Sequence, residues 1–136
     1  MKFYVATRLE NVAAAKALAS ELESEGHELT YDWTRHGSVQ SESREVKRAV
    51  AAREREGIRQ ARVVVVLLPG GRGTHCELGM AVAYGKQVLL VSDSAEVQSV
   101  RTCVFYWHDF VMHLPDPGAV VTWFRAATTL ESSRDS

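Results

Sequence analysis

The amino-acid sequence predicts a single α/β domain built on a doubly wound, parallel five-stranded sheet with helices on both faces. Three observations lead to this fold class. Short runs rich in β-branched residues alternate along the chain with longer segments of helical periodicity, as expected for βαβ units. The run 63–68 is continuously apolar, which is typical of a central strand covered on both faces. The length of 136 residues is that of one domain.

The first elements follow from local patterns. Residues 2–6 are mostly apolar β-formers and predict a buried strand. Asn11 precedes a helix rich in Ala and Leu, and Gly26 closes that helix as the residue after its C-cap. Residues 28–33 alternate polar and apolar side chains, which predicts a second strand. The polar segment 34–43 predicts a loop.

The middle of the chain carries the strongest signals. A charged helix is predicted over about 42–60 and a third strand over 62–68. The Pro- and Gly-containing segment 69–73 breaks the chain and predicts a turn. A helix is then predicted over 75–84 and a fourth strand over 87–92. This alternation is typical of a sheet of the Rossmann or flavodoxin kind.

The pattern weakens towards the C-terminus. Residues 104–107 and 110–114 are competing candidates for the fifth strand. The last helix is predicted over 117–130, and residues 131–136 form an expected disordered tail. We find no internal repeat, low-complexity tract or linker, so residues 1–130 are expected to form one domain.

Charge and cysteine content narrow the function classes. The formal net charge is −1, so nothing favours binding of a nucleic acid polymer or of an anionic membrane surface. Cys76 and Cys103 stand far apart without a zinc-binding spacing, which favours a reducing, cytoplasmic location. The longest apolar run falls far below the ~20 residues that span a bilayer. The five histidines lack an HExxH-type spacing, so we expect no metal and no cofactor.

Ligands of open parallel sheets bind at the carboxyl ends of the strands, where the strand order reverses. At that edge Gly70, Gly71 and Gly73 allow the backbone to approach a ligand closely and to adopt a positive φ. Thr74 is placed to cap the next helix and leave free N–H groups for an anion, and Arg72 adds charge. The turn therefore predicts a phosphate or sugar site, although an ordinary strand-to-helix turn has the same pattern. It is neither a Walker loop nor a dinucleotide motif.

Two glutamates are the candidates for chemistry. Glu77 follows Thr74 by three residues, so it is either the partner in a capping box or a carboxylate that acts as nucleophile or base. Glu54 falls inside the apolar stripe of the charged helix. A carboxylate on that face is either ion-paired for structural reasons or part of the site. His36 and His75 are weaker candidates for the same site.

Further candidate residues lie at or near the ends of strands, at the same edge of the predicted sheet. Tyr4 and Trp33 are aromatic residues that either stack on a base or pack in the core. Asp32 either binds a hydroxyl group or caps its loop. Thr7 and Arg8 directly follow the first predicted strand.

With these residues in place, the sequence resembles the nucleoside 2-deoxyribosyltransferase-like superfamily over residues 2–92. The resemblance rests on the opening Phe-Tyr-Val-Ala-Thr-Arg of residues 3–8 and on the block Glu-Leu-Gly-Met-Ala of residues 77–81. Gly-Lys-Gln-Val follows at residues 85–88. This family cleaves the N-glycosidic bond of a nucleoside or nucleoside monophosphate, so the resemblance implies the same reaction here.

The resemblance also implies roles for individual residues. Glu77 matches the glutamate that attacks the anomeric carbon to form a covalent glycosyl-enzyme, and Glu54 takes the place of the acid that handles the base. Tyr4 would orient the nucleophile. A further set of residues would contact the sugar, its phosphate or the base: Thr7, Arg8, Asp32, Trp33, Gly70, Gly71, Arg72, Gly73 and Thr74.

Alternatives remain within and outside this reaction class. The turn also matches the Pro-Gly-Gly-x-Gly-Thr-x-x-Glu pattern of phosphoribohydrolases that release cytokinin bases from nucleoside 5′-monophosphates. A non-catalytic nucleotide sensor and a regulatory interaction protein are the other hypotheses. Because the superfamily usually assembles with its sites near a subunit interface, we expect a homodimer or higher homo-oligomer. Hydrolase and transferase are not distinguished by the sequence.

Overall fold

The computed structural model describes residues 1–99 and 102–135. Its sheet has five strands in the order β2-β1-β3-β4-β5, and every neighbouring pair is parallel. The elements are β1 (Lys2–Ala6), η1 (Leu9–Asn11), α1 (Val12–Ser24), β2 (Glu28–Leu29), η2 (Trp33–Arg35), α2 (Arg44–Gln60), β3 (Val63–Leu67), α3 (Arg72–Ala83), β4 (Gln87–Val91), α4 (Ser94–Gln98), η3 (Val104–Trp107), β5 (Val111–Leu114) and α5 (Pro117–Asp135). This confirms the predicted doubly wound fold.

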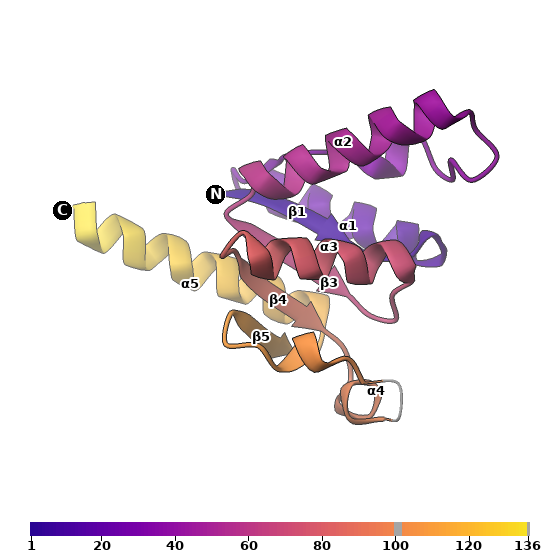
Figure 1. Cartoon of the computed structure of the whole chain (residues 1–136). Helices are drawn as coiled ribbons and strands as arrows, with labels where there is room; N and C mark the ends of the chain where they lie inside the picture. Colours follow the sequence, from indigo (N-terminus) through magenta and orange to yellow (C-terminus); the bar gives the residue numbers. More distant parts are fainter. Residues whose placement is uncertain (100–101, 136) are drawn as a thin grey trace.

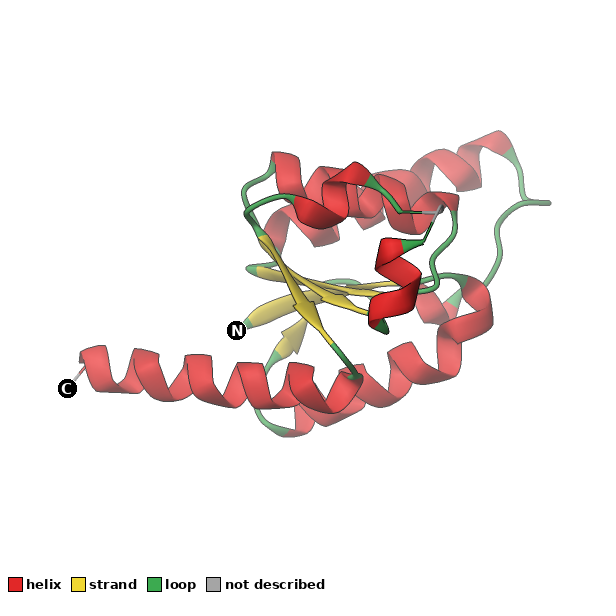
Figure 2. Cartoon of the chain, turned by 90° about the horizontal axis from the view of Figure 1, so that it is seen from below, coloured by secondary structure: helices red, strands yellow, loops and turns green. Residues whose placement is uncertain are grey.

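The sheet lies between two helical layers (Figures 1 and 2). Helices α2 and α3 pack together on one face, and α1 and α5 pack together on the other. All five residues of β3 are buried, as the apolar run predicted, because this central strand is covered from both sides. Phe3 of β1 meets Phe124 of α5 edge to face, with ring centroids 6.0 Å apart. The last turns of α5 project beyond the sheet (Figure 1).

The second strand is shorter than the pattern predicted. Only Glu28 and Leu29 pair with β1, although the alternation continues to residue 33. The chain turns because the Trp33 indole N–H donates to the Val5 carbonyl at 2.7 Å and so takes a bond that a longer β2 would supply. Residues 33–35 form the 3-10 helix η2 instead.

The other differences concern boundaries. Helix α2 begins at Arg44, where Ser43 caps it by accepting the Val46 N–H at 3.2 Å. The fifth strand lies within the second of the two competing segments, and residues 104–107 form η3.

Two helices near the C-terminus differ from the prediction. Helix α4 was not expected from the sequence. Helix α5 continues to Asp135, so its predicted end at residue 130 was wrong; residue 136 of the expected tail lies outside the described residues.

The glycine that ends α1 behaves as predicted. Gly26 has a φ of 90°, a conformation that a residue without Cβ adopts at no steric cost. Within the part of the chain that the structure describes, no helix is both long and apolar enough to cross a bilayer.

Candidate active site

The strand order reverses between β1 and β3, and the main cleft opens at the carboxyl ends of these strands, as the topology requires. Its volume is about 520 Å³, within the range of small-molecule sites. Its walls come from the segment after β1, the loop before α2, α2 itself and the first turns of α3. The lining residues are Thr7, Arg8, Leu9, Glu10, Trp33, His36, Gly37, Ser38, Val39, Gln40, Lys47, Val50, Ala51, Glu54, Gly71, Arg72, Gly73, Thr74 and Glu77.

Glu77 is the buried acid of this cleft. Its side chain comes from the second turn of α3 and only 8% of the residue is exposed. Its Oε2 atom is buried without a hydrogen-bond partner among the described residues. Burial raises the pKa of the carboxyl to about 8, the Tyr4 hydroxyl lowers it, and the negative charge of Glu54 raises it further. An unpaired carboxyl at the wall of a cleft is costly to stability and available for chemistry.

Tyr4 faces Glu77 from the sheet below. The residue is fully buried in β1, and burial, followed by the charges of Glu77 and Glu54, raises the pKa of its phenol. Its hydroxyl is buried and lacks a formed hydrogen bond within the described residues. The phenol therefore stays protonated and lies ready to donate to the Glu77 carboxyl. A glycine in α2 makes room for this ring: a Cβ on Gly57 would lie 3.2 Å from two Tyr4 ring atoms.

Glu54 is the second acid of the cleft. It is half-buried on α2. Of the residues predicted to share its apolar stripe, Val50, Gly57, Ile58 and Ala61 are buried, whereas Val46 in the first turn is 39% exposed. Burial raises the pKa of the Glu54 carboxyl, and His36 lowers it. No ion pair holds this carboxylate among the described residues. The two acids thus reach one cleft from two helices.

The glycine turn differs from its predicted capping pattern. Helix α3 starts at Arg72 with Gly71 as its N-cap residue, so Thr74 lies inside the first turn and does not cap the helix from outside. The Thr74 hydroxyl accepts the Gly71 N–H at 3.0 Å. The alternative in which Glu77 forms a capping box with Thr74 was therefore wrong, because the helix begins three residues earlier than that box requires. This frees Glu77 from a capping role.

Among the three glycines of the turn, only Gly70 is required for space, and none is required for an unusual backbone. Only Gly26, Gly37 and Gly85 have a positive φ among the described residues, which corrects the expectation for the turn. A Cβ on Gly70 would lie 2.6 Å from Thr74 Cγ2, a distance that the packing cannot accept.

Thr7 and Arg8 have different surroundings. The buried Thr7 hydroxyl donates to the Leu67 carbonyl at 2.8 Å, so it ties the end of β1 to the end of β3. Asn11 Nδ2 donates to Thr7 Oγ1 at 3.3 Å and to the Pro69 carbonyl at 3.2 Å, which anchors the glycine turn from η1. The Arg8 side chain is 42% exposed, 3.9 Å from Glu10, and available to a ligand in the cleft.

Trp33 and Asp32 are separated by the structure. Trp33 lines the cleft with its indole N–H committed to the sheet. Asp32 lies outside that lining: it accepts the Thr34 N–H at 3.1 Å and pairs with Arg35 at 3.3 Å, as a loop cap does. A second cavity of about 330 Å³ under α1 and η2 is lined by both residues but by neither Glu54 nor Glu77.

Sequence reasoning missed part of the cleft. Lys47 on α2 and Gln40 on the preceding loop line it, and neither belongs to a recognisable motif. His36, only a weak candidate in the sequence, lies near Glu54 and keeps its Nδ1 at 2.9 Å from the Gly37 carbonyl. The signal that could have found them is topological, since the polar loop 34–43 leaves a strand end beside the switch point. The described residues hold no cluster of three or more metal-ligating side chains.

Comparison with known proteins shows to which family the chain is similar. The family model described as nucleoside 2-deoxyribosyltransferase matches residues 3–124. A search of curated proteins finds no match.

Two solved structures resemble the chain. A 2-deoxyribosyltransferase from the psychrotolerant bacterium Bacillus psychrosaccharolyticus is 22% identical with a TM-score of 0.67, over 88% of this chain and 90% of that one. A CMP N-glycosidase of Clostridium botulinum is 18% identical with a TM-score of 0.61, over 86% of this chain and 90% of that one. At these identities the likeness shows a shared fold.

Proposed function

The chain belongs to the nucleoside 2-deoxyribosyltransferase family, and from this premise we propose that it cleaves the N-glycosidic bond of a nucleoside or nucleoside 5′-monophosphate with Glu77 as the nucleophile. As a member of that family it is an enzyme of the transferase and N-glycosidase kind. One observation carries the proposed mechanism: the Glu77 carboxyl at the wall of the switch-point cleft is buried, and its Oε2 atom has no hydrogen-bond partner in the part of the chain that the structure describes.

The first step forms a glycosyl-enzyme. A Glu77 carboxylate oxygen bonds to the anomeric carbon while the bond from that carbon to the base nitrogen breaks, and its electron pair leaves with the base. Glu54 donates a proton to the departing base. Burial of both carboxyls, together with the negative charge of Glu54 beside Glu77, favours a pair that holds one proton. The reactive form is the one in which Glu54 carries this proton and Glu77 is ionised.

The second step releases the sugar. Water or a second nucleobase attacks the anomeric carbon, the bond to Glu77 breaks, and Glu54 accepts the proton of the attacking group. Tyr4 donates its hydroxyl hydrogen bond to the Glu77 carboxylate and orients it through both steps. Two displacements at one carbon predict retention of its configuration.

The basic residues of the cleft suit a phosphate or sugar hydroxyls. Arg8, Lys47 and Arg72 line the cleft together with the N-terminal turn of α3, whose N–H groups favour an anion. If a 5′-monophosphate is the substrate, Arg8→Gln raises KM for the monophosphate far more than for the nucleoside. Arg48→Gln is the matched control, because Arg48 is exposed on α2 and does not line the cleft.

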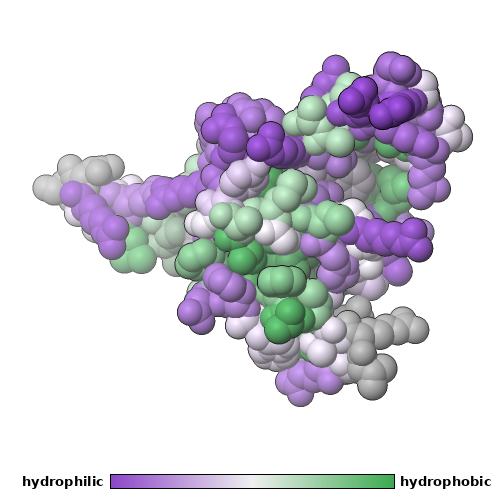
Figure 3. Space-filling model, in the orientation of Figure 1, coloured by the Kyte–Doolittle hydropathy of each residue, from purple (hydrophilic) through white to green (hydrophobic). Residues whose placement is uncertain are grey.

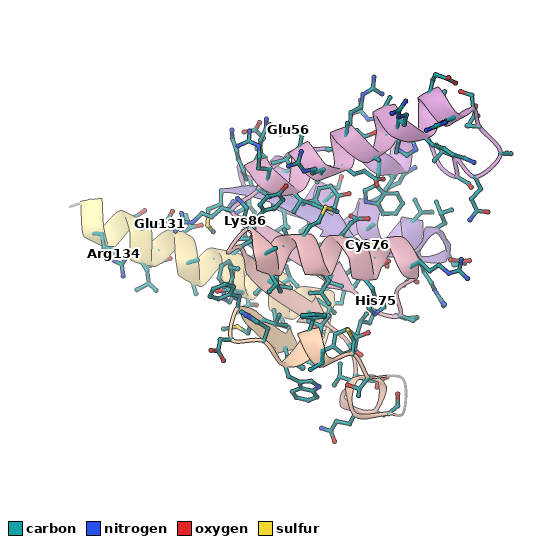
Figure 4. The ribbon with its side chains drawn as sticks, in the orientation of Figure 1. Glu56, His75, Cys76, Lys86, Glu131 and Arg134 are labelled. Atoms are coloured by element: carbon teal, nitrogen blue, oxygen red, sulfur yellow. The ribbon has the colours of Figure 1, made fainter. Side chains whose placement is uncertain are left out.

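The decisive test is chromatography of deoxy and ribo nucleosides and their 5′-monophosphates after incubation with the protein, with and without a second free base. Base release by the wild type that is lost in Glu77→Gln supports the proposal, and a swapped nucleoside identifies a transferase. Glu56→Gln is the control, since Glu56 is an exposed partner of Arg59 on the outer side of α2 (Figure 4). Binding without turnover on the whole panel would instead identify a sensor.

We also propose that the enzyme assembles as a homo-oligomer through an apolar surface on η3 and β5. The side chains of Val104, Phe105, Trp107, Phe110 and Met112 are between 43% and 74% exposed. They lie on η3, on β5 and between the two, beside the free edge of the sheet. Figure 3 shows an apolar area over the middle and lower part of the molecule. Such a surface favours association. Light scattering of wild type and Trp107→Glu tests the proposal, which fails if both are monomers.

A further inference from the structure

A chain of hydrogen bonds links β5 to the glycine turn of the cleft. His113 Nε2 on β5 lies 2.6 Å from the Tyr106 carbonyl of η3. The Tyr106 hydroxyl lies 2.6 Å from His75 Nε2 on α3. His75 Nδ1 in turn lies 2.7 Å from the Gly71 carbonyl. Figure 4 shows His75 near the N-terminal end of α3, on the side that faces η3 and β5.

The chemistry of these contacts assigns the protons. A carbonyl oxygen only accepts, so His75 Nδ1 must carry the hydrogen that it shares with Gly71. In the neutral ring Nε2 is then an acceptor, and the Tyr106 hydroxyl donates to it. The contact between the two side chains therefore specifies one tautomer of His75.

The N–H and the carbonyl group of Gly71 both form hydrogen bonds. Its N–H donates to Thr74, and its carbonyl accepts from the His75 ring as well as from the His75 N–H at 3.2 Å. Gly71 is the N-cap of α3 and lines the cleft. Its orientation sets the direction in which the first N–H groups of α3 point, and Glu77 follows on the next turn of the same helix.

We propose that His75 and Tyr106 are positioning residues that hold the glycine turn in its substrate-binding geometry; this inference rests on the proposed function. Neither side chain lines the cleft, so both act through Gly71. Tyr106 is itself well anchored, because it is 3% exposed and its carbonyl is bound by His113. The segment before β5 thereby supports the site of its own chain.

The first test removes one hydroxyl. Tyr106→Phe is expected to raise KM and to lower kcat/KM by about fivefold to tenfold, the worth of one hydrogen bond, because a loosened turn binds the sugar or phosphate less well. Tyr84→Phe is the matched control: the Tyr84 hydroxyl accepts from Arg55 at 2.8 Å at the far end of α3. An unchanged kcat/KM in Tyr106→Phe, or an equal loss in both variants, overturns the proposal.

A double-mutant cycle separates positioning from general destabilisation. If the pair acts through one contact, His75→Gln combined with Tyr106→Phe loses no more kcat/KM than His75→Gln alone. Losses that multiply would mean that the two residues act independently, and would overturn the proposal. Thermal unfolding of each variant accompanies the kinetics, so that a folding defect is seen directly.

Nitrogen-15 NMR of the histidine rings gives a readout besides activity. The wild type is expected to show His75 as the Nδ1–H tautomer, and Tyr106→Phe to shift the His75 Nε2 signal. A wild-type His75 in the Nε2–H form overturns the contact itself, whatever the activity. If the wild type turns over nucleosides and Tyr106→Phe has the same kcat/KM, only the positioning role is overturned. If the wild type turns over no nucleoside, the proposed function is overturned.

Discussion

Replacing Glu77 by glutamine should stabilise the protein, and increasingly so as the pH rises. Burial raises the pKa of the Glu77 carboxyl from the ordinary 4.5 to about 8, so the native state binds this proton more tightly than the unfolded chain does. Stability is then highest below the unfolded pKa and falls as the pH rises towards 8. Glutamine has nearly the same shape and does not titrate, so the variant escapes this loss.

The magnitude follows from the two pKa values. At 1.36 kcal/mol for each pKa unit, the wild type loses about 3 to 4 kcal/mol relative to Glu77→Gln between pH 5 and pH 8. For a domain of this size that corresponds to a difference in Tm of roughly 10 °C. The effect of the substitution is therefore seen mainly in how the free energy of unfolding changes with pH, and less in its value at any one pH.

The assay is urea unfolding of both proteins at several pH values from 5 to 8. Glu56→Gln is the control, because hydrogen bonds from Arg59 and then Gln60 lower the pKa of the Glu56 carboxyl to about 2. That group is ionised in both the folded and the unfolded states across this range, so its substitution adds no slope. A stability difference between wild type and Glu77→Gln that stays constant from pH 5 to 8 would refute the reasoning.

Three further predictions follow from the site. The kcat/KM of the wild type should fall as the pH rises above about 8, because the reaction needs one proton on the Glu54–Glu77 pair and the pair loses that proton near the pKa of Glu77; initial rates that stay flat from pH 6 to 9 contradict this. Gly70→Ala should destabilise by about 1 to 3 kcal/mol because its Cβ would lie 2.6 Å from Thr74, whereas Gly79→Ala, with open space around it, should stabilise α3 by up to about 1 kcal/mol. Equal urea midpoints for those two variants would be incompatible with the packing. Thr7→Val should cost about 1 to 3 kcal/mol in urea unfolding because it leaves the carbonyl at the end of β3 without its donor.

Much of the fold and part of the site were readable from local patterns. The apolar run of β3, the stripe of α2 and the glycine after α1 each reflect a periodicity or a backbone requirement that neighbouring residues define. The same patterns brought Glu54 and Glu77 forward as candidates, and both line the cleft. The order of the strands within the sheet was not predicted and comes from the structure.

The ends of some elements and the hydrogen-bond partners of individual residues could not be predicted from local patterns. The sequence could not show that Trp33 takes the Val5 carbonyl and ends β2 early, because that bond joins residues far apart along the chain. It placed Thr74 outside α3, whereas the hydrogen bond from Gly71 places it inside. Segment 104–107 was one of two candidates for the fifth strand because its residues are β-formers, whereas in the folded chain it is a 3-10 helix.

The sequence by itself determined the fold class, the family resemblance and the identity of the candidate acids, since these depend on residue types at short spacings. Only the tertiary structure decided which groups are buried and what faces them. It left the Oε2 atom of Glu77 beside Tyr4 without a hydrogen-bond partner among the described residues and joined His75 to Tyr106 across α3 and η3. The physical reason is that burial, pKa and hydrogen-bond partners depend on distances between residues remote in the chain, and those distances exist only once the chain has folded.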